Sequence, residues 1–283
     1  MTFKTLRSLA RFGQAVHVIR PLIGLYSRLR CGLRSGGLSF LPEKEIFNKI
    51  LYELDLKPKN SLEAYVEELL CDKSLENQFE RMCKEHSIVK YANWGDKVKY
   101  FPGNVVIYYA LIREICPQVI VETGTATGSM TAYILAALNR NGRGVLKSID
   151  IPPVKGQLTM NLSLSAGDIG YWIPEVYKNK WIYIEGDAKL VLPKVLAEEK
   201  VDFFIHDSLH TRSHMMFEYS VARALMPRGA IIASDDVLWN NSYDDFLMTN
   251  RLRGYAPYSN PNIAIAVNSF DAFEVEQGLN IIR

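Results

Sequence analysis

Hydrophobic and polar positions follow two different patterns along the chain. Residues 43–86 place apolar side chains at helical spacing among charged ones, which predicts two or three amphipathic helices. After Pro102 and Gly103, short β-branched runs alternate with stretches of helical periodicity. The runs are Val119–Val121, Val145–Ile149, Trp181–Ile184, Val201–Ile205 and Ala230–Ala233. The helical stretches are Ser129–Asn139, Lys189–Glu199 and Arg212–Leu225.

This alternation of strand and helix predicts an α/β fold. A mostly parallel sheet covered by helices on both faces is expected. Near the end of the chain, Ile263–Val267 and Phe273–Glu276 are predicted to be two further strands joined by a short turn, so that the last strand is antiparallel. We therefore expect a seven-stranded sheet in a domain over residues 101–283, preceded by a basic segment and helical extension over residues 1–100.

Composition and charge set limits on the class of protein. Apolar residues make up 48% of the 283 and charged residues 23%, as in ordinary globular proteins. A net charge of +2 gives no reason to expect a nucleic-acid partner. The four cysteines are scattered without a C-x-x-C pair, so we expect reduced thiols and a cytoplasmic protein. No apolar run approaches the ~20 residues of a membrane span.

Residues 1–37 are unusually basic. They contain seven Lys or Arg residues and no Asp or Glu, and apolar residues recur among them at near-helical spacing. The favoured interpretation is a helix packed on the body of the protein or on a second subunit, and we expect a homo-oligomer. The alternatives are peripheral contact with an anionic membrane surface, and a disordered arm.

A glycine-rich loop follows the first predicted strand of the sheet. Its residues, from Glu122 to Ser129, read E-T-G-T-A-T-G-S, and a predicted helix follows. Glycines permit a sharp turn and close approach of a ligand, and the helix offers free N–H groups. The loop departs from the dinucleotide pattern G-x-G-x-x-G, because Ala126 replaces the second glycine and Gly128 comes one residue early. A nucleotide cofactor and a purely structural turn are the alternatives to the interpretation that follows.

The pattern acidic-x-G-x-A-x-G, from Glu122 through Gly124 and Ala126 to Gly128, resembles the first motif of class I S-adenosylmethionine (SAM)-dependent methyltransferases. The resemblance implies a Rossmann-like fold, with SAM as cofactor. It also implies that the Glu122 carboxylate engages the amino-acid end of SAM, with Ser129 beside it.

Two further strand ends support a SAM site. Asp150 ends the second strand, where a carboxylate can accept hydrogen bonds from ribose hydroxyls. Glu185–Ala188, with the sequence E-G-D-A, ends the third strand. The resemblance implies that Asp187, followed by Ala188, contacts the adenine amino group.

Acidic residues also follow the fourth and fifth strands. Asp207, Asp235 and Asp236 come after neighbouring parallel strands, so their side chains are expected to converge. Three carboxylates repel one another unless a cation offsets their charge, and Mg²⁺ suits them best, with Mn²⁺ or Ca²⁺ as alternatives. The alternative is that Asp235 or Asp236 caps the next segment.

The stretch Asp207–Tyr219 resembles macrocin-type O-methyltransferases, relatives of the metal-dependent catechol group. The catechol group has an Asp-Asn pair where this chain has Asp235 and Asp236. The resemblance implies that His210, three residues after Asp207, is the general base. We expect His206 to be buried and structural, and for His214 a contact with substrate or with the site residues is one alternative.

The sequence therefore predicts a SAM-dependent, metal-assisted O-methyltransferase acting on a small-molecule or glycan hydroxyl. Candidate acceptor loops are Tyr91–Phe101, Ile151–Lys180, Trp239–Asn241 and Arg253–Asn260. The alternatives are a metal-independent methyltransferase, a NAD(P)-dependent oxidoreductase, and a non-catalytic protein of the same fold that works in assembly or at a membrane surface.

Overall fold

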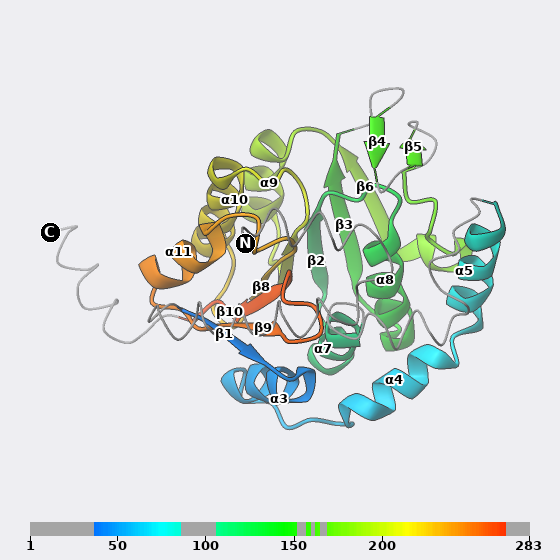
Figure 1. Ribbon diagram of the computed structural model, residues 1–283, viewed down its shortest axis with the longest axis horizontal. Coiled ribbons are helices and arrows are strands. Elements are labelled where there is room, and N and C mark those ends of the chain that lie inside the picture. The colour runs from blue at the N-terminus through cyan, green and yellow to red at the C-terminus, as the bar shows by residue number, and fades with distance from the viewer. Residues whose placement is uncertain (1–36, 86–105, 152–156, 160–161, 165–168, 270–283) are drawn as a thin grey trace, which may run out of the picture.

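A single eight-stranded sheet forms the centre of the molecule (Figure 1). The computed structural model describes residues 37–85, 106–151, 157–159, 162–164 and 169–269. The sheet order is β1-β9-β10-β8-β7-β2-β3-β6. Its strands are β1 (Leu38–Leu41), β2 (Val119–Thr123), β3 (Val145–Asp150), β6 (Trp181–Glu185), β7 (Phe203–His206), β8 (Ile231–Ser234), β9 (Gly254–Pro257) and β10 (Ala264–Val267). A separate antiparallel hairpin pairs β4 (Gln157–Thr159) with β5 (Leu162–Leu164).

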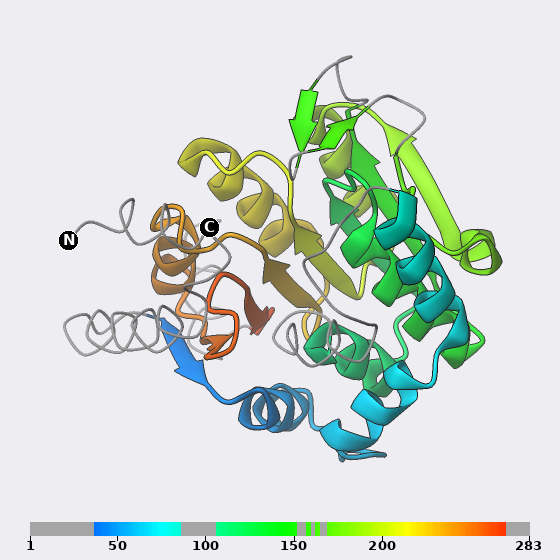
Figure 2. The ribbon, with the colours of Figure 1, turned by 45° about the vertical axis from the view of Figure 1, so that its right-hand side comes forward.

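Helices lie on both faces of the sheet, as Figure 2 shows most clearly. On one side are α3 (Glu43–Glu53), α4 (Leu62–Leu70), α5 (Lys73–Glu85), α7 (Ile107–Ile115), α8 (Ser129–Asn141) and the 3-10 helix η3 (Glu175–Lys180). On the other side are α9 (Ala188–Glu198), α10 (Arg212–Leu225) and α11 (Ser242–Thr249). The α/β class and the Rossmann-like arrangement predicted from the sequence are confirmed.

Among the described residues, β10 is the one strand of this sheet that runs antiparallel to its neighbours, β8 and β9. The expected antiparallel last strand is therefore present. The sheet has eight strands and not the expected seven, because β1 pairs in parallel with β9 at the edge. The four residues of β1 are too few to show a pattern of their own, and the pairing with β9 fixes them.

The final strand pair was assigned wrongly. The strand next to β10 is Gly254–Pro257, within the stretch expected to be an acceptor loop, and Phe273–Glu276 lies outside the described residues. Gly254 packs against Leu247 of α11, where a Cβ would come within 2.4 Å of a leucine methyl carbon. Glycine is therefore needed for this close approach, although it lowers the apparent strand propensity.

Successive side chains of the strands point to opposite faces of the sheet and so contribute to two hydrophobic cores. In β2 and β7, Ile120 and Ile205 face the core under α7 and α8, whereas Val121 and Phe204 face the core under α9 and α10. All four side chains are essentially inaccessible to solvent. Burial on both faces explains why these strands read as continuous apolar runs in the sequence.

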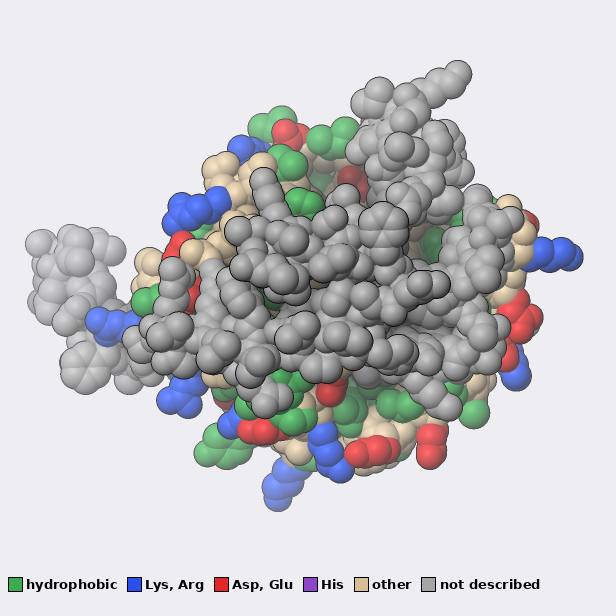
Figure 3. Space-filling model, viewed as in Figure 1, with side chains coloured by type: hydrophobic (Ala, Val, Ile, Leu, Met, Phe, Trp, Pro, Cys, Tyr) green, Lys and Arg blue, Asp and Glu red, His purple; other side chains and the backbone are tan. Residues whose placement is uncertain are grey.

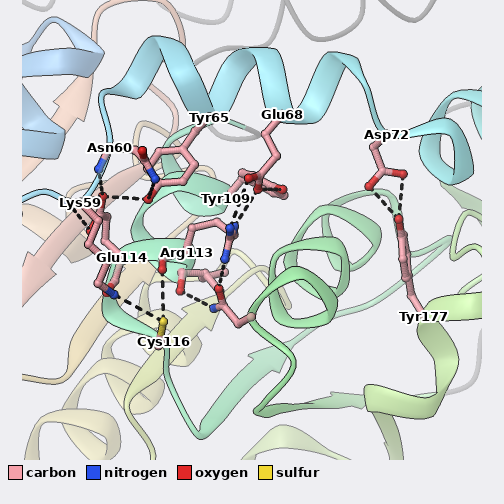
Figure 4. Close-up of polar contacts among 12 residues, drawn as sticks. Lys59, Asn60, Tyr65, Glu68, Asp72, Tyr109, Arg113, Glu114, Cys116 and Tyr177 are labelled. Atoms are coloured by element: carbon pink, nitrogen blue, oxygen red, sulfur yellow. Dashed lines mark hydrogen bonds and ion pairs between the residues drawn. The ribbon is translucent and has the colours of Figure 1, made fainter.

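Polar contacts fasten the N-terminal helices to the body of the protein (Figure 4). The buried Glu114 carboxylate of α7 accepts hydrogen bonds from the backbone N–H groups of Lys59 and Asn60, at 2.9 and 3.0 Å, and from the Tyr65 hydroxyl at 2.8 Å. Tyr177 of η3 donates to Asp72, just before α5, at 2.7 Å. With β1 in the sheet, residues 37–85 are thus integrated with the C-terminal elements. The predicted domain boundary near residue 100 lies outside the described residues.

The described surface mixes charges of both signs, as Figure 3 shows around the rim of the molecule. None of the helices in the described part of the chain is long and apolar enough to cross a membrane. The segment predicted to pack on a partner or a membrane, residues 1–37, lies outside the described residues except for Gly37, so its role stays a prediction, as do the cytoplasmic location and the homo-oligomer.

Candidate active site

The glycine-rich loop joins β2 to α8 through three residues with left-handed backbone. These are Gly124 (φ +83°), Ala126 (φ +45°) and Gly128 (φ +81°). A Cβ on Gly124 would lie 2.2 Å from the carbonyl oxygen of Asp207, so only glycine allows this contact. The loop is therefore pressed directly against the end of β7.

Asp150 ends β3 and holds the loop in this shape. Its Oδ2 accepts hydrogen bonds from the backbone N–H groups of Thr125 and Ala126, at 2.8 and 2.9 Å. The backbone N–H of Gly186 in turn donates to the Asp150 carbonyl oxygen at 2.9 Å, which brings the end of β6 alongside. The three strand ends predicted to form the SAM site are thus contiguous.

Glu122 is buried, with 1% of its surface exposed. Its carboxylate accepts hydrogen bonds from the hydroxyls of Ser148 (2.6 Å) and Thr131 (3.0 Å), and so links β2 to β3 and α8. Burial raises the pKa of Glu122 to about 7, although these hydroxyls act in the opposite direction. The carboxylate oxygens are thus already occupied by protein hydroxyls, and contact with the amino-acid end of SAM stays a prediction.

The residues expected at the adenine end stand at the start of α9. Asp187 is the N-cap residue of this helix, and its side chain accepts a hydrogen bond from the backbone N–H of Lys189 at 2.8 Å. Ala188, the first helical residue, is buried. Ser129 occupies the matching first position of α8, after Gly128 as N-cap.

Asp207 lies between the glycine-rich loop and the pair Asp235 and Asp236. Its backbone N–H donates to the carbonyl oxygen of Thr123 at 2.9 Å. The backbone N–H of Asp235 donates to the His206 carbonyl oxygen at 2.8 Å. The Asp207 side chain is partly buried. This partial burial and the nearby Asp235 raise the pKa of Asp207 well above its ordinary range, and Glu122 and Asp236 add to this effect. The acidic side chains therefore repel one another, as expected from their positions at the ends of neighbouring strands.

The described residues nevertheless contain no group of three His, Cys, Asp or Glu side chains close enough to hold a metal ion. Asp236 adopts a left-handed backbone (φ +51°), and its carbonyl oxygen accepts a hydrogen bond from the backbone N–H of Trp239 at 2.9 Å. This tight turn carries Trp239 back toward β7.

His210 lies where Asp207 and Trp239 meet. Its Nε2 is 3.7 Å from Asp207 Oδ1, and its ring stacks on the Trp239 indole with 5.6 Å between centroids and 28° between planes. Asn240 donates to the His210 carbonyl oxygen at 3.2 Å. Trp239 is 49% exposed and Leu209 is 58% exposed. A basic nitrogen, a carboxylate and two accessible apolar side chains thus share one corner of the molecule.

The other two histidines face inward. His206 is fully buried, as expected. His214 is also buried, and its Nε2 lies 2.7 Å from the Glu218 carboxylate on the same helix. The sequence prediction missed Glu218 altogether. The one signal for it is the spacing of four residues from His214, which places both side chains on one helix face.

Comparison with known proteins agrees with this geometry. A family model described as a methyltransferase domain matches residues 121–237, from the last residues of β2 to the turn after β8. A search among curated proteins finds no relative of this chain. Residues 121–237 are therefore similar to a methyltransferase domain, which agrees with the resemblance to SAM-dependent methyltransferases found in the sequence.

Two solved structures with a similar course of the chain are described as O-methyltransferases. The O-methyltransferase from Bacillus cereus in complex with SAH is 15% identical, with 72% of this chain and 96% of that chain covered and a TM-score of 0.46. The O-methyltransferase TomG from Streptomyces achromogenes, involved in tomaymycin synthesis and solved with SAM, is also 15% identical, with 81% and 100% covered and a TM-score of 0.46. Likeness at this level gives no information about the acceptor.

Proposed function

We propose that this protein transfers the methyl group of SAM to a hydroxyl group of a small-molecule or glycan acceptor. One observation supports this above the others: the backbone at Asp207, three residues before His210, touches the glycine-rich loop at Gly124. A methyl donor on the loop and an acceptor beside His210 would therefore be neighbours. Methyl transfer requires this proximity, because the acceptor oxygen must approach the methyl carbon in line with its bond to sulfur.

His210 is proposed as the general base. An alcohol is a weak nucleophile until it loses its proton, and a histidine is suited to accept that proton near neutral pH. The hydroxyl proton passes to His210 while the oxygen forms its bond to the methyl carbon. The carbon–sulfur bond breaks at the same time, and its electron pair stays on sulfur. Asp207, 3.7 Å from His210 Nε2, stabilises the resulting imidazolium.

A divalent cation is proposed to assist. Asp207, Asp235 and Asp236 would hold it, because carboxylate oxygens suit Mg²⁺. The pKa of Asp207 is raised first by burial and then by the negative charge of Asp235, and a cation would offset that charge. Such a cation lowers the pKa of a hydroxyl bound to it. In the metal-independent alternative, Asp207 and His210 act alone.

The acceptor is proposed to rest on Trp239 and Leu209. Both side chains are about half exposed next to His210, and an indole face suits either the C–H face of a sugar or a flat phenol. The non-catalytic and nicotinamide-dependent alternatives have no comparable support in the site.

The test is transfer of a labelled methyl group from SAM to panels of glycosides and phenols, with Mg²⁺ or with excess chelator. Labelled ether products support the proposal. Full activity in excess chelator would reject the role of the cation but would still support O-methylation. Labelling of amines or thiols in place of hydroxyls would contradict O-methylation.

A further inference from the structure

A second polar cluster lies beneath the candidate active site, centred on Glu218 of α10. Four side chains surround its carboxylate. Thr123 donates to Oε2 at 2.6 Å, and His206 Nδ1 lies 2.6 Å from the same oxygen. Ser208 donates to Oε1 at 2.8 Å, and His214 Nε2 lies 2.7 Å from that oxygen. We call these five residues the Glu218 cluster.

Each member outside α10 is the chain neighbour of a candidate site residue. Thr123 immediately precedes Gly124 of the glycine-rich loop, and His206 and Ser208 stand on either side of Asp207. The Asp207 side chain is partly exposed, while both of its neighbours bind Glu218 in the interior. One carboxylate on α10 therefore ties the end of β2 to the end of β7, where the loop and Asp207 touch.

The cluster is built around a fixed negative charge. Although burial alone would raise the pKa of Glu218, the hydrogen bonds from His206 and His214 lower it to about 2. An ionised carboxylate only accepts hydrogen bonds, so the proton of His206 is held on Nδ1. Glu218 and His206 are both fully inaccessible to solvent, so water offers no substitute for these bonds.

The cluster also reaches the candidate base. The His206 ring meets the His210 ring edge to face, with 5.3 Å between centroids and 74° between planes. Trp239 stacks on His210 as well. The orientation of the His210 ring is thus set by two aromatic neighbours, and Glu218 holds one of them.

We propose that Glu218 is a positioning residue of the methyl-transfer site: through Thr123, His206 and Ser208 it fixes how the glycine-rich loop and Asp207 face each other. It does not touch substrate or cofactor itself. This inference rests on the proposed function, because the loop and Asp207 are taken as the two halves of the site.

The first test replaces Glu218 by Gln, which keeps the shape of the side chain but loses the charge and puts an NH₂ group where one oxygen accepted hydrogen bonds. Affinity for S-adenosylhomocysteine, the demethylated form of SAM, is measured by calorimetry on the full chain. We expect the dissociation constant to rise at least fivefold, and turnover with any acceptor found for the wild-type protein to fall at least tenfold.

Glu114→Gln is the matched control. Glu114 is also buried and also accepts several hydrogen bonds, but its partners are in the N-terminal segment and not in the site. It should lower the thermal midpoint as Glu218→Gln does, with affinity unchanged. Equal losses of affinity in the two variants would show a general effect of stability and overturn the proposal.

A second pair of variants covers the case that Glu218→Gln does not fold. Thr123→Val removes a single hydrogen bond and keeps the shape, whereas Thr123→Ser keeps the hydroxyl. We expect weaker binding of S-adenosylhomocysteine in the valine variant and near wild-type binding in the serine variant. Unchanged affinity in a folded Glu218→Gln, or in Thr123→Val where Glu218→Gln does not fold, would overturn the role of Glu218. A wild-type protein that binds no S-adenosylhomocysteine would instead overturn the proposed function.

Discussion

Replacing Gly124 by Ala tests the contact between the glycine-rich loop and Asp207. Gly124 has φ +83°, and its Cβ would lie 2.2 Å from the Asp207 carbonyl oxygen and 2.9 Å from the Ser208 Cα. These neighbours are backbone atoms, which cannot rotate away as a flexible side chain can. The loop and the end of β7 must therefore separate by roughly 1 Å to reach ordinary contact.

The expected cost has two parts. A left-handed backbone costs a residue with a Cβ about 1–2 kcal/mol, and overpacking costs about 1–3 kcal/mol more. For a protein of this size, the sum lowers the thermal midpoint by on the order of 3–8 °C. The displaced loop should also lose SAM affinity by more than tenfold, which corresponds to about 1.4 kcal/mol.

Gly142→Ala is the control. Gly142 ends α8 with a similar left-handed backbone, φ +69°, but a Cβ there would meet nothing within 4 Å. It should cost only about 1–2 kcal/mol and leave SAM affinity intact. Thermal unfolding and calorimetric titration with SAM on both variants make the comparison. If both variants bound SAM equally well, the reasoning about the loop and Asp207 would be refuted.

Three further predictions concern single residues of the site. His210→Gln should slow methyl transfer on the order of 100-fold with SAM affinity unchanged, and an unaltered rate would remove His210 as the base. Trp239→Ala should raise the KM for the acceptor much more than Trp239→Phe does, and equal KM values for both variants and the wild type would place the acceptor elsewhere. The raised pKa of Glu122 means that its folded state favours the neutral form, so its contribution to stability is fully present below pH 4.5 and is lost as pH rises through 7. Glu122→Gln should therefore be more stable than the wild type by roughly 3 kcal/mol at pH 8 and nearly as stable as the wild type at pH 4.5. Urea unfolding of both proteins at both pH values measures this. The same difference in stability between the two proteins at both pH values would contradict the raised pKa of Glu122.

The central strands and their helices could be predicted because each element carries its own pattern. The predicted Arg212–Leu225 has the bounds of α10, and the five apolar runs fall on β2, β3, β6, β7 and β8. Of these strands, β2, β7 and β8 are buried almost throughout, so their residues are mostly apolar regardless of distant partners. Because these strands are parallel, the acidic and glycine-rich residues that follow them were expected at the same edge of the sheet.

Other features depend on contacts that no local pattern reveals. β9 contains Gly254 and Pro257 and resembles a loop, yet its pairing with β1 and β10 makes it a strand. Glu218 is an acidic residue on a mixed helix, and only the fold shows that Thr123, 95 residues earlier, donates a hydrogen bond to it. The same holds for Gly124, whose glycine is required by contact with Asp207 as well as by the turn.

Calorimetric titration of the full chain with SAM tests the central claim most directly. The loop at Gly124–Gly128, with Asp150 and Asp187 at the neighbouring strand ends, predicts saturable binding of one SAM per chain, and weaker binding in Gly124→Ala than in Gly142→Ala. A folded protein that gives no binding signal with SAM would contradict the assignment of this site to methyl transfer.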